Sequence, residues 1–317
     1  MGRHGLDQLY CHRWRSVKGV VMRRFALIAI PYFWLLALFL VPFAIVFKIS
    51  LSDIALSIPP YLPQLDLAKG WEGLTKFLGA LDFENFEFLM MDDLYYKAYL
   101  SSLKIAAIST FLTLLIGYPI AYAMTRASEE WRPTLLMLVI LPFWTSFLIR
   151  VYAWIGILGQ EGFLNQTLMF LGLTSEPLII LNTPIAVYIG IVYTYLPFMI
   201  LPIYSALEKL DDSLLEAAED LGCSRIKAFW LVTFPLSRGG IIAGCFLVFI
   251  PTLGEFVIPS LLGGSNTLMI GKVLWDEFFS NRDWPLASAV AVILLLILII
   301  PIILFQRNEQ KQRESEG

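Results

Sequence analysis

Charged residues are scarce in this chain of 317 residues. Aspartate, glutamate, lysine and arginine make up only 15% of it, whereas hydrophobic residues make up 58%, and the mean hydropathy is +0.71. A water-soluble domain of this length needs far more charge to cover its surface. The scarcity of charge therefore excludes a soluble globular protein and predicts an integral membrane protein.

Patterns of metal-ligating and catalytic residues are also absent. The three cysteines, Cys11, Cys223 and Cys245, form no CxxC spacing, and both histidines lie near the N-terminus. The chain has no phosphate-binding G-x-x-x-x-G-K-[ST] loop, no HExxH, GxSxG or GxGxxG motif, and no basic patch typical of nucleic-acid binding. We therefore expect no catalytic residues, no metal site and no cofactor bound by this chain. If ATP is used, another chain must hydrolyse it.

What the sequence does contain is a series of long apolar runs. Each is near the ~20 residues that a helix needs to cross the hydrocarbon of a bilayer. The first run is too long for the apolar part of a signal peptide, and no small-x-small cleavage site follows it, so we expect it to remain as an anchor. The predicted spans cover roughly residues 25–49, 98–124, 134–156, 183–206, 239–261 and 286–305.

Lysine and arginine are unevenly distributed between the two ends of these spans. Fifteen of them lie on the side of the N-terminal tail and six on the opposite side. Because cytoplasmic loops carry the excess of positive charge, both tails, residues 1–24 and 307–317, are predicted to be cytoplasmic. Between them lies one transmembrane domain, residues 25–306, with an external segment at 50–97 and a polar cytoplasmic loop at 207–238.

The polar loop between the fourth and fifth spans has strong helix start and stop signals. Ser213 and Glu216 match the S-x-x-E capping box that starts a helix, and Gly222 provides the left-handed residue that ends one. Ser224 is placed to cap a second helix, which Pro235 is expected to end. The pattern predicts a helix–glycine–helix hook, which is either an amphipathic connector lying on the bilayer or a docking surface.

The spacing within this hook, E-A-A-x3-G-x9-V-x-F-P, resembles the EAA loop of ABC-importer permease subunits, E-A-A-x3-G-x9-I-x-L-P. Two positions differ conservatively, Val232 for isoleucine and Phe234 for leucine. In that family the loop is the coupling helix that fits a cleft on the ATPase subunit. The resemblance implies an ATPase-coupling role for Glu216, Ala217, Ala218, Gly222, Val232 and Pro235.

Three charged residues fall inside the predicted spans. Glu255 lies about 17 residues and Arg150 about 16 residues into their spans, and Lys104 lies about six residues from the outer end of its span. All three therefore belong to the outer third of the membrane. Unpaired charges there are costly, so Glu255 either forms a structural ion pair with Arg150 or Lys104, or binds a cationic substrate. Tyr152 and Trp154 are placed to hold an ammonium over a ring, although an interfacial aromatic belt explains them equally well.

The backbone around Glu255 is predicted to be irregular. Gly254 precedes it, and Pro251 and Pro259 flank it. Irregular backbone at membrane depth occurs where it is buried in protein or lines a cavity. Glu255, Arg150, Tyr152 and Trp154 are therefore the candidate residues of a substrate pathway.

The resemblance extends through the spans. FWTSFLIRVYAW at 143–154, LGQEGFLN at 158–165 and TLGEFVIPSLLGG at 252–264 are similar to the polyamine (spermidine/putrescine) branch of these permeases. The resemblance implies an all-α fold of six transmembrane helices, of the type I importer kind, and putrescine import across the bacterial inner membrane by alternating access. It also implies three partners: a cytoplasmic ABC ATPase dimer that uses ATP, a second homologous permease, and a periplasmic polyamine-binding protein.

Residue chemistry alone leaves a different class of function open. Six spans with intramembrane charges also suit a self-sufficient secondary transporter or a channel for a small cation. A capped docking loop has no purpose in such a protein. A membrane-embedded enzyme is disfavoured because no paired catalytic motif occurs.

Overall fold

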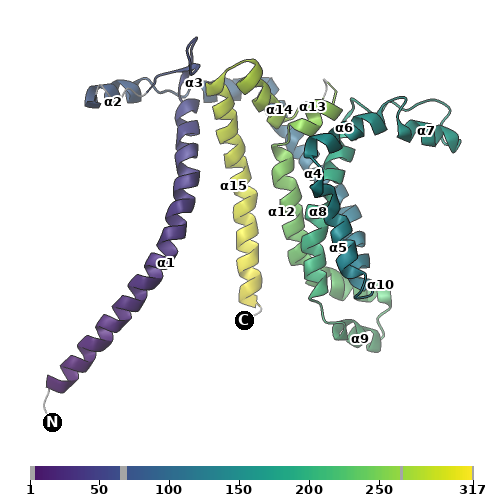
Figure 1. The fold of residues 1–317 in the computed structure, drawn as a ribbon, viewed down its shortest axis with the longest axis horizontal. Coiled ribbons are helices and arrows are strands. Elements are labelled where there is room, and N and C mark those ends of the chain that lie inside the picture. The colour runs from purple at the N-terminus through teal and green to yellow at the C-terminus, as the bar shows by residue number, and fades with distance from the viewer. Residues whose placement is uncertain (1–3, 65–69, 265–266, 316–317) are drawn as a thin grey trace.

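The chain is almost entirely helical in a computed structural model that describes residues 4–64, 70–264 and 267–315 (Figure 1). The predicted all-α class is confirmed, and the exception is an unpredicted antiparallel pair of short strands, β1 (Asp53–Ile54) and β2 (Tyr61–Leu62). The helices are α1 (His4–Ser50), α2 (Gly70–Gly79), α3 (Glu84–Met91), α4 (Asp93–Arg126), α5 (Arg132–Ile140), α6 (Phe147–Leu158), α7 (Phe163–Phe170), α8 (Pro184–Glu208), α9 (Ser213–Asp220), α10 (Arg225–Ala228), α11 (Phe234–Leu236), α12 (Arg238–Leu253), α13 (Val257–Leu262), α14 (Ile270–Trp275) and α15 (Trp284–Ser315), with a 3-10 segment η2 (Leu141–Trp144) and π segments η3 (Phe229–Thr233) and η4 (Asp276–Ser280).

Among the described residues, five helices are long and apolar enough to cross a membrane, or six when one bent pair of helices is counted as a span. The first, second and sixth predicted spans lie within α1, α4 and α15, and the fourth matches α8 except for its first residue, so those helices are confirmed. In α1 the helix also continues backward through the polar segment as far as His4.

The third predicted span is wrong as a single helix, because the structure divides residues 134–156 between α5 and α6. The break follows Pro142, whose 3-10 turn ends at Thr145 in extended conformation with ψ 149°. Proline removes a backbone N–H and clashes with the preceding turn, which explains an interruption at this point. The continuous apolar stretch of sufficient length is instead Phe147–Phe170, formed by α6 and α7.

The fifth predicted span is likewise interrupted, as the glycine and prolines around Glu255 indicated. Helix α12 ends at Leu253, and α13 begins only at Val257. The predicted irregular backbone at Gly254 and Glu255 is therefore confirmed.

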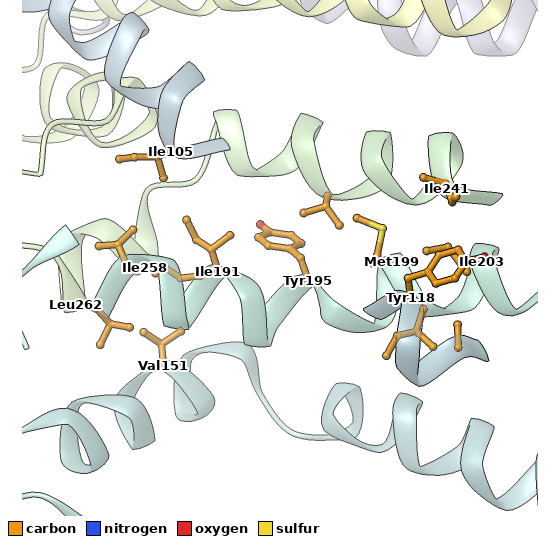
Figure 2. Packing of buried hydrophobic residues seen from close by; sticks show 14 of the residues in the cluster. Ile105, Tyr118, Val151, Ile191, Tyr195, Met199, Ile203, Ile241, Ile258 and Leu262 are labelled. Carbon is orange, nitrogen blue, oxygen red and sulfur yellow. The ribbon is translucent and has the colours of Figure 1, made fainter. Parts of the chain in front are cut away.

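The core lies where α4, α8 and α12 pack together, and α6 and α13 pack against the end of α8 near Pro184 (Figure 1). Side chains from these helices point toward one another, among them Tyr118, Met199 and Ile241 (Figure 2). Close approach of α12 to α8 depends on small residues, since a Cβ at Gly240 would lie 2.6 Å from the carbonyl oxygen of Pro202. Small residues at helix interfaces provide the packing that membrane helices need in the absence of a hydrophobic driving force.

Helix α1 stands apart from this core and contacts chiefly α15 (Figure 1). From Leu27 to Ile45 most of its apolar side chains are exposed, including Phe33 at 72% and Leu35 at 66%. Such a surface is stable only in lipid or against another protein, in agreement with a membrane protein.

The beginning of α1, the end of α15 and the short helices α9 and α10 all lie toward the same end of the molecule (Figure 1). The segments after α1, after α6 and after α13 lie toward the opposite end. The arrangement agrees with the sides assigned from the distribution of lysine and arginine. We refer to these as the hook end and the outer end.

Candidate functional site

The hook, residues Asp211–Ser237, begins with a different cap from the predicted one. The Asp211 carboxylate accepts a hydrogen bond from the backbone N–H of Ser213 at 2.9 Å. This bond lowers the pKa of Asp211. No side-chain hydrogen bond joins Ser213 to Glu216 among the described residues, so the capping-box prediction is wrong. An aspartate two positions earlier takes up a free N–H at the start of α9, which leaves the Glu216 side chain exposed.

Gly222 ends α9 as predicted. Its φ is +85°, in the left-handed region that glycine adopts without strain. The N–H of Cys223 bonds to the carbonyl of Ala218, and the N–H of Gly222 bonds to that of Glu219. These two bonds form a Schellman motif, which satisfies the last carbonyls of the helix and fixes the direction in which the chain leaves it.

The second half of the hook is helical, as predicted. Helical structure runs from Arg225 through the π segment to Leu236, and the axis then bends by 63° into α12. The second helix begins directly after Ser224, as predicted, although the Ser224 side chain makes no cap bond with any described residue. The helical stretch ends one residue after Pro235, close to the predicted end. The π segment ends two residues before the proline, where a wider turn accommodates the lost N–H.

Buried contacts join the hook to the hook end of α4. The ring of Tyr118 packs against Phe229 and Phe234, with centroids 5.7 and 5.8 Å away, and its hydroxyl lies 3.0 Å from that of Ser237. An exposed ion pair adds a second connection, since Arg126 donates to Asp212 at 3.0 Å. The hook is therefore packed directly against a spanning helix.

The hook also carries exposed apolar side chains, which we call its exposed apolar face. It includes Leu221, 87% exposed, Ile226, 75% exposed, and Leu231, 66% exposed. Ala217 and Glu216 are exposed on the same short helix. Exposed apolar clusters of this kind on an ordered segment mark protein-interaction surfaces.

Glu255 lies in the break between α12 and α13 and is 8% exposed. Its Oε2 accepts a hydrogen bond from the Tyr195 hydroxyl at 2.6 Å, and its Oε1 accepts from the backbone N–H groups of Val257 at 3.0 Å and Ile258 at 3.3 Å. Carboxylates at helix N-termini are stabilised by the free N–H groups there. The carboxylate therefore ties α8 to the start of α13.

The predicted ion pair of Glu255 is not formed, because no pair joins it to Arg150 or Lys104 among the described residues. The Arg150 guanidinium instead lies over the rings of Phe143 and Phe147, at 5.5 and 5.9 Å. Its Nε and Nη1 are covered and have no hydrogen-bond partner in residues 4–64, 70–264 and 267–315. Arginine is suited to stacking on aromatic faces, which explains how this charge is accommodated away from an acid.

The remaining candidates lie on α6 with Arg150. Trp154 packs edge-on against Tyr193 of α8 at 5.3 Å, whereas Tyr152 is 58% exposed. The group that the structure does bring to Glu255 is Tyr195, which the sequence did not single out. Nothing in the spacing distinguishes this tyrosine from the others, because its partner lies 60 residues away in the chain.

A bundle of long apolar helices with an ordered polar hook at one end is the arrangement of a multi-pass membrane protein. Residues 13–314 match the family described as "Binding-protein-dependent transport system inner membrane component". The chain belongs to this family.

Curated relatives support the placement within the polyamine branch. The chain is 43% identical to the Spermidine/putrescine transport system permease protein PotB of Haemophilus influenzae, over 84% of this chain and 86% of that protein. It is also 43% identical to PotB of Escherichia coli, over 69% and 79% of the two chains. The inner membrane ABC transporter permease protein YdcU of E. coli is 33% identical, over 66% and 68%. The branch predicted from the motifs is confirmed.

Solved structures show the same fold at low sequence identity. A bacterial ABC transporter involved in the import of the polysaccharide alginate matches with a TM-score of 0.63 and 16% identity, over 93% of this chain and 99% of that one. The MetNI methionine ABC transporter in an inward-facing conformation matches with a TM-score of 0.51 and 16% identity, over 70% and 99%. The predicted fold of an ABC-importer permease is confirmed.

Proposed function

We propose that this chain is the transmembrane subunit of an ATP-driven ABC importer that moves putrescine across the bacterial inner membrane by alternating access. The observation that carries the proposal is the hook, where a Schellman turn at Gly222 presents an exposed apolar face at the hook end. A separate ATPase subunit docks on Glu216, Ala217, Ala218, Gly222, Val232 and Pro235 and hydrolyses the ATP, so this chain itself is not an enzyme.

Three partners complete the proposed transporter. An ATPase dimer offers two docking clefts and this chain supplies one hook, so a second, homologous permease provides the other. A periplasmic binding protein delivers the polyamine at the outer end, in line with the names of the relatives in this family. With the hook on the cytoplasmic side, the ends of α1 and α15 are cytoplasmic too, which matches the excess of lysine and arginine there.

The proposed substrate pathway runs beside the break between α12 and α13. Glu255 supplies the negative charge for an ammonium group. Trp154, which lies on α6 and packs against Tyr193 of α8, supplies an aromatic ring for the same group. Arg150 and Tyr152 lie on α6, which contacts α13. Because like charges repel, Arg150 would set a boundary to the route and would not bind the diamine itself.

Uptake by reconstituted vesicles tests this function. We expect putrescine to accumulate only when the ATPase, the second permease and the loaded binding protein are all present with ATP. Putrescine should also stimulate ATP hydrolysis more than spermidine does, since the proposal assigns the importer to the shorter diamine. Uptake driven by an ion gradient through this chain alone would show a secondary transporter or channel instead.

A further inference from the structure

An apolar groove lies between α4, α5 and α8, and its volume is about 260 Å³. It extends from Met124 and Leu135, near the hook end, to Pro142 and Tyr193, which are nearer the outer end. All ten side chains that line it are apolar, apart from the hydroxyl of Tyr193. Leu138 is one of them and is 57% exposed, so the groove opens to the surface of the bundle. Such a groove accommodates a hydrocarbon chain.

The guanidinium of Arg150 lies at the outer end of this groove. Its central carbon is 5.5 Å from the ring centroid of Phe143, the residue after Pro142. The Phe143 ring in turn contacts Phe198 of α8 at 5.2 Å, and Phe198 follows Pro197, which also lines the groove. The groove and the cation therefore share a wall.

The positive charge of Arg150 has no acidic partner within the part of the chain that the structure describes. Helix α6 contacts α13, but the carboxylate beside α13, Glu255, is bonded to Tyr195 and to the start of α13. The Arg150 nitrogens Nε and Nη1 are covered by protein, which leaves Nη2 as the nitrogen that a ligand can reach. Because unpaired charges in apolar surroundings are costly, a negatively charged ligand at Nη2 would be stabilising.

The side chains near Arg150 indicate the depth of the site in the membrane. Ile149 is 67% exposed and Trp144 is 72% exposed. Exposed apolar side chains on a spanning bundle face lipid, and tryptophan is enriched at the level of the lipid headgroups. Helix α6 also lies toward the outer end (Figure 1). These features place the guanidinium near the headgroups of the leaflet at the outer end, within reach of their phosphates.

We propose that Arg150 and the groove form a binding site for an anionic phospholipid of the leaflet at the outer end, such as phosphatidylglycerol. The phosphate accepts hydrogen bonds from Nη2, a pairing for which arginine is well suited. One acyl chain passes Pro142 and lies in the groove toward Leu135. These two residues are about 10 Å apart along the helix axis, which is within the ~15 Å of hydrocarbon in one leaflet. The inference does not depend on the proposed transport function.

A carboxylate of a second permease is the other group that could neutralise Arg150. It would account for the charge, but not for the apolar groove that continues from it between α4, α5 and α8. One lipid molecule accounts for both. Bound in this way, the lipid would hold α5 against α8 at the point where Pro142 interrupts the helix.

A photoreactive phosphatidylglycerol, with a diazirine near the end of one acyl chain, tests the site. The full chain, with any subunits that co-purify, is placed in phosphatidylcholine vesicles that contain a small fraction of this probe, and labelled peptides are quantified after illumination. We expect labelling of the groove residues in α5 and α8. Arg150→Gln should lower it about tenfold relative to labelling of α1, whose exposed side chains serve as the internal reference. Leu138→Trp fills the groove and should also lower it, with Arg150 unchanged.

The matched control is Lys104→Gln, which removes an exposed positive charge of α4 outside the groove and should keep wild-type labelling. The same diazirine on phosphatidylcholine should label the wild-type groove less. Equal labelling with both headgroups, or labelling that Arg150→Gln leaves unchanged, overturns the site. So does displacement of the probe by equimolar inorganic phosphate, which would assign Arg150 to a free anion. Loss of a co-purifying subunit in Arg150→Gln with unchanged lipid labelling would assign it to a carboxylate of that subunit. If Arg150→Gln does not fold, the comparison of the two headgroups in the wild type still decides the site.

Discussion

Replacing Glu216 with lysine is expected to abolish ATP-driven uptake of putrescine while the protein stays in the membrane in normal amount. The Glu216 side chain is exposed on α9 and forms no internal hydrogen bond or ion pair among the described residues, so its reversal leaves the packing of the bundle intact. Reversing a charge at a docking surface introduces repulsion where the wild type has attraction, and such juxtapositions cost several kcal/mol. Uptake, ATPase co-purification and membrane content are measured together.

The control for this prediction is Glu130→Lys. Glu130 is an exposed acid in the loop between α4 and α5, at the same end of the molecule, and lies outside the hook. We expect this variant to transport at the wild-type rate. Wild-type ATPase binding and uptake by the Glu216→Lys variant would show that the hook does not couple hydrolysis to transport.

The second large effect is expected at Glu255. Glu255→Gln keeps a side-chain oxygen that can accept from the N–H groups at the start of α13, but it removes the negative charge. If that charge binds an ammonium group, uptake falls about tenfold or more, since hydrogen bonds to charged groups contribute about 1.5–3 kcal/mol. Assembly with the other subunits should fall much less, and both are measured on the same preparations.

The variant Tyr195→Phe distinguishes a substrate-binding role of the Glu255 carboxylate from a purely structural one. The phenylalanine loses the 2.6 Å hydrogen bond to Glu255 but leaves the carboxylate charged. The pathway proposal expects this variant to keep most of its uptake. Equal losses in Tyr195→Phe and Glu255→Gln, or no loss in either, would assign the carboxylate to tying α8 to α13 and not to the substrate.

The parts of the fold that the sequence predicts well are those set by local chemistry. Gly222 takes its left-handed conformation because the turn needs no Cβ, and the break before Glu255 follows from the glycine and prolines around it. The positions of α4 and α8 are also predicted by local chemistry, because each lies in an apolar run long enough to cross a membrane as a helix.

The errors occur where several local signals compete. Ser213 with Glu216 and Asp211 both offer a cap to the start of α9, and the sequence does not rank them; the structure uses Asp211. Similarly, Pro142 divides the third apolar run, although other prolines leave their spans continuous.

The hydrogen-bond partners of the candidate site residues could not be predicted from sequence patterns. These partners are determined by packing between helices that are distant in the chain. The bonds from Tyr195 to Glu255 and from Arg126 to Asp212 join residues 60 and 86 positions apart.

The most direct test of the hook as the ATPase docking site uses a residue that the chain already has. Cys223 is half-buried in the turn after Gly222, next to the exposed Leu221. In a Cys11→Ser background, a maleimide that does not cross membranes labels Cys223, and the rate is measured with and without the ATPase. We predict that the ATPase slows labelling several-fold in the wild type and leaves it unchanged in Glu216→Lys. An assembled transporter whose Cys223 reacts as fast with the ATPase as without it would contradict the account.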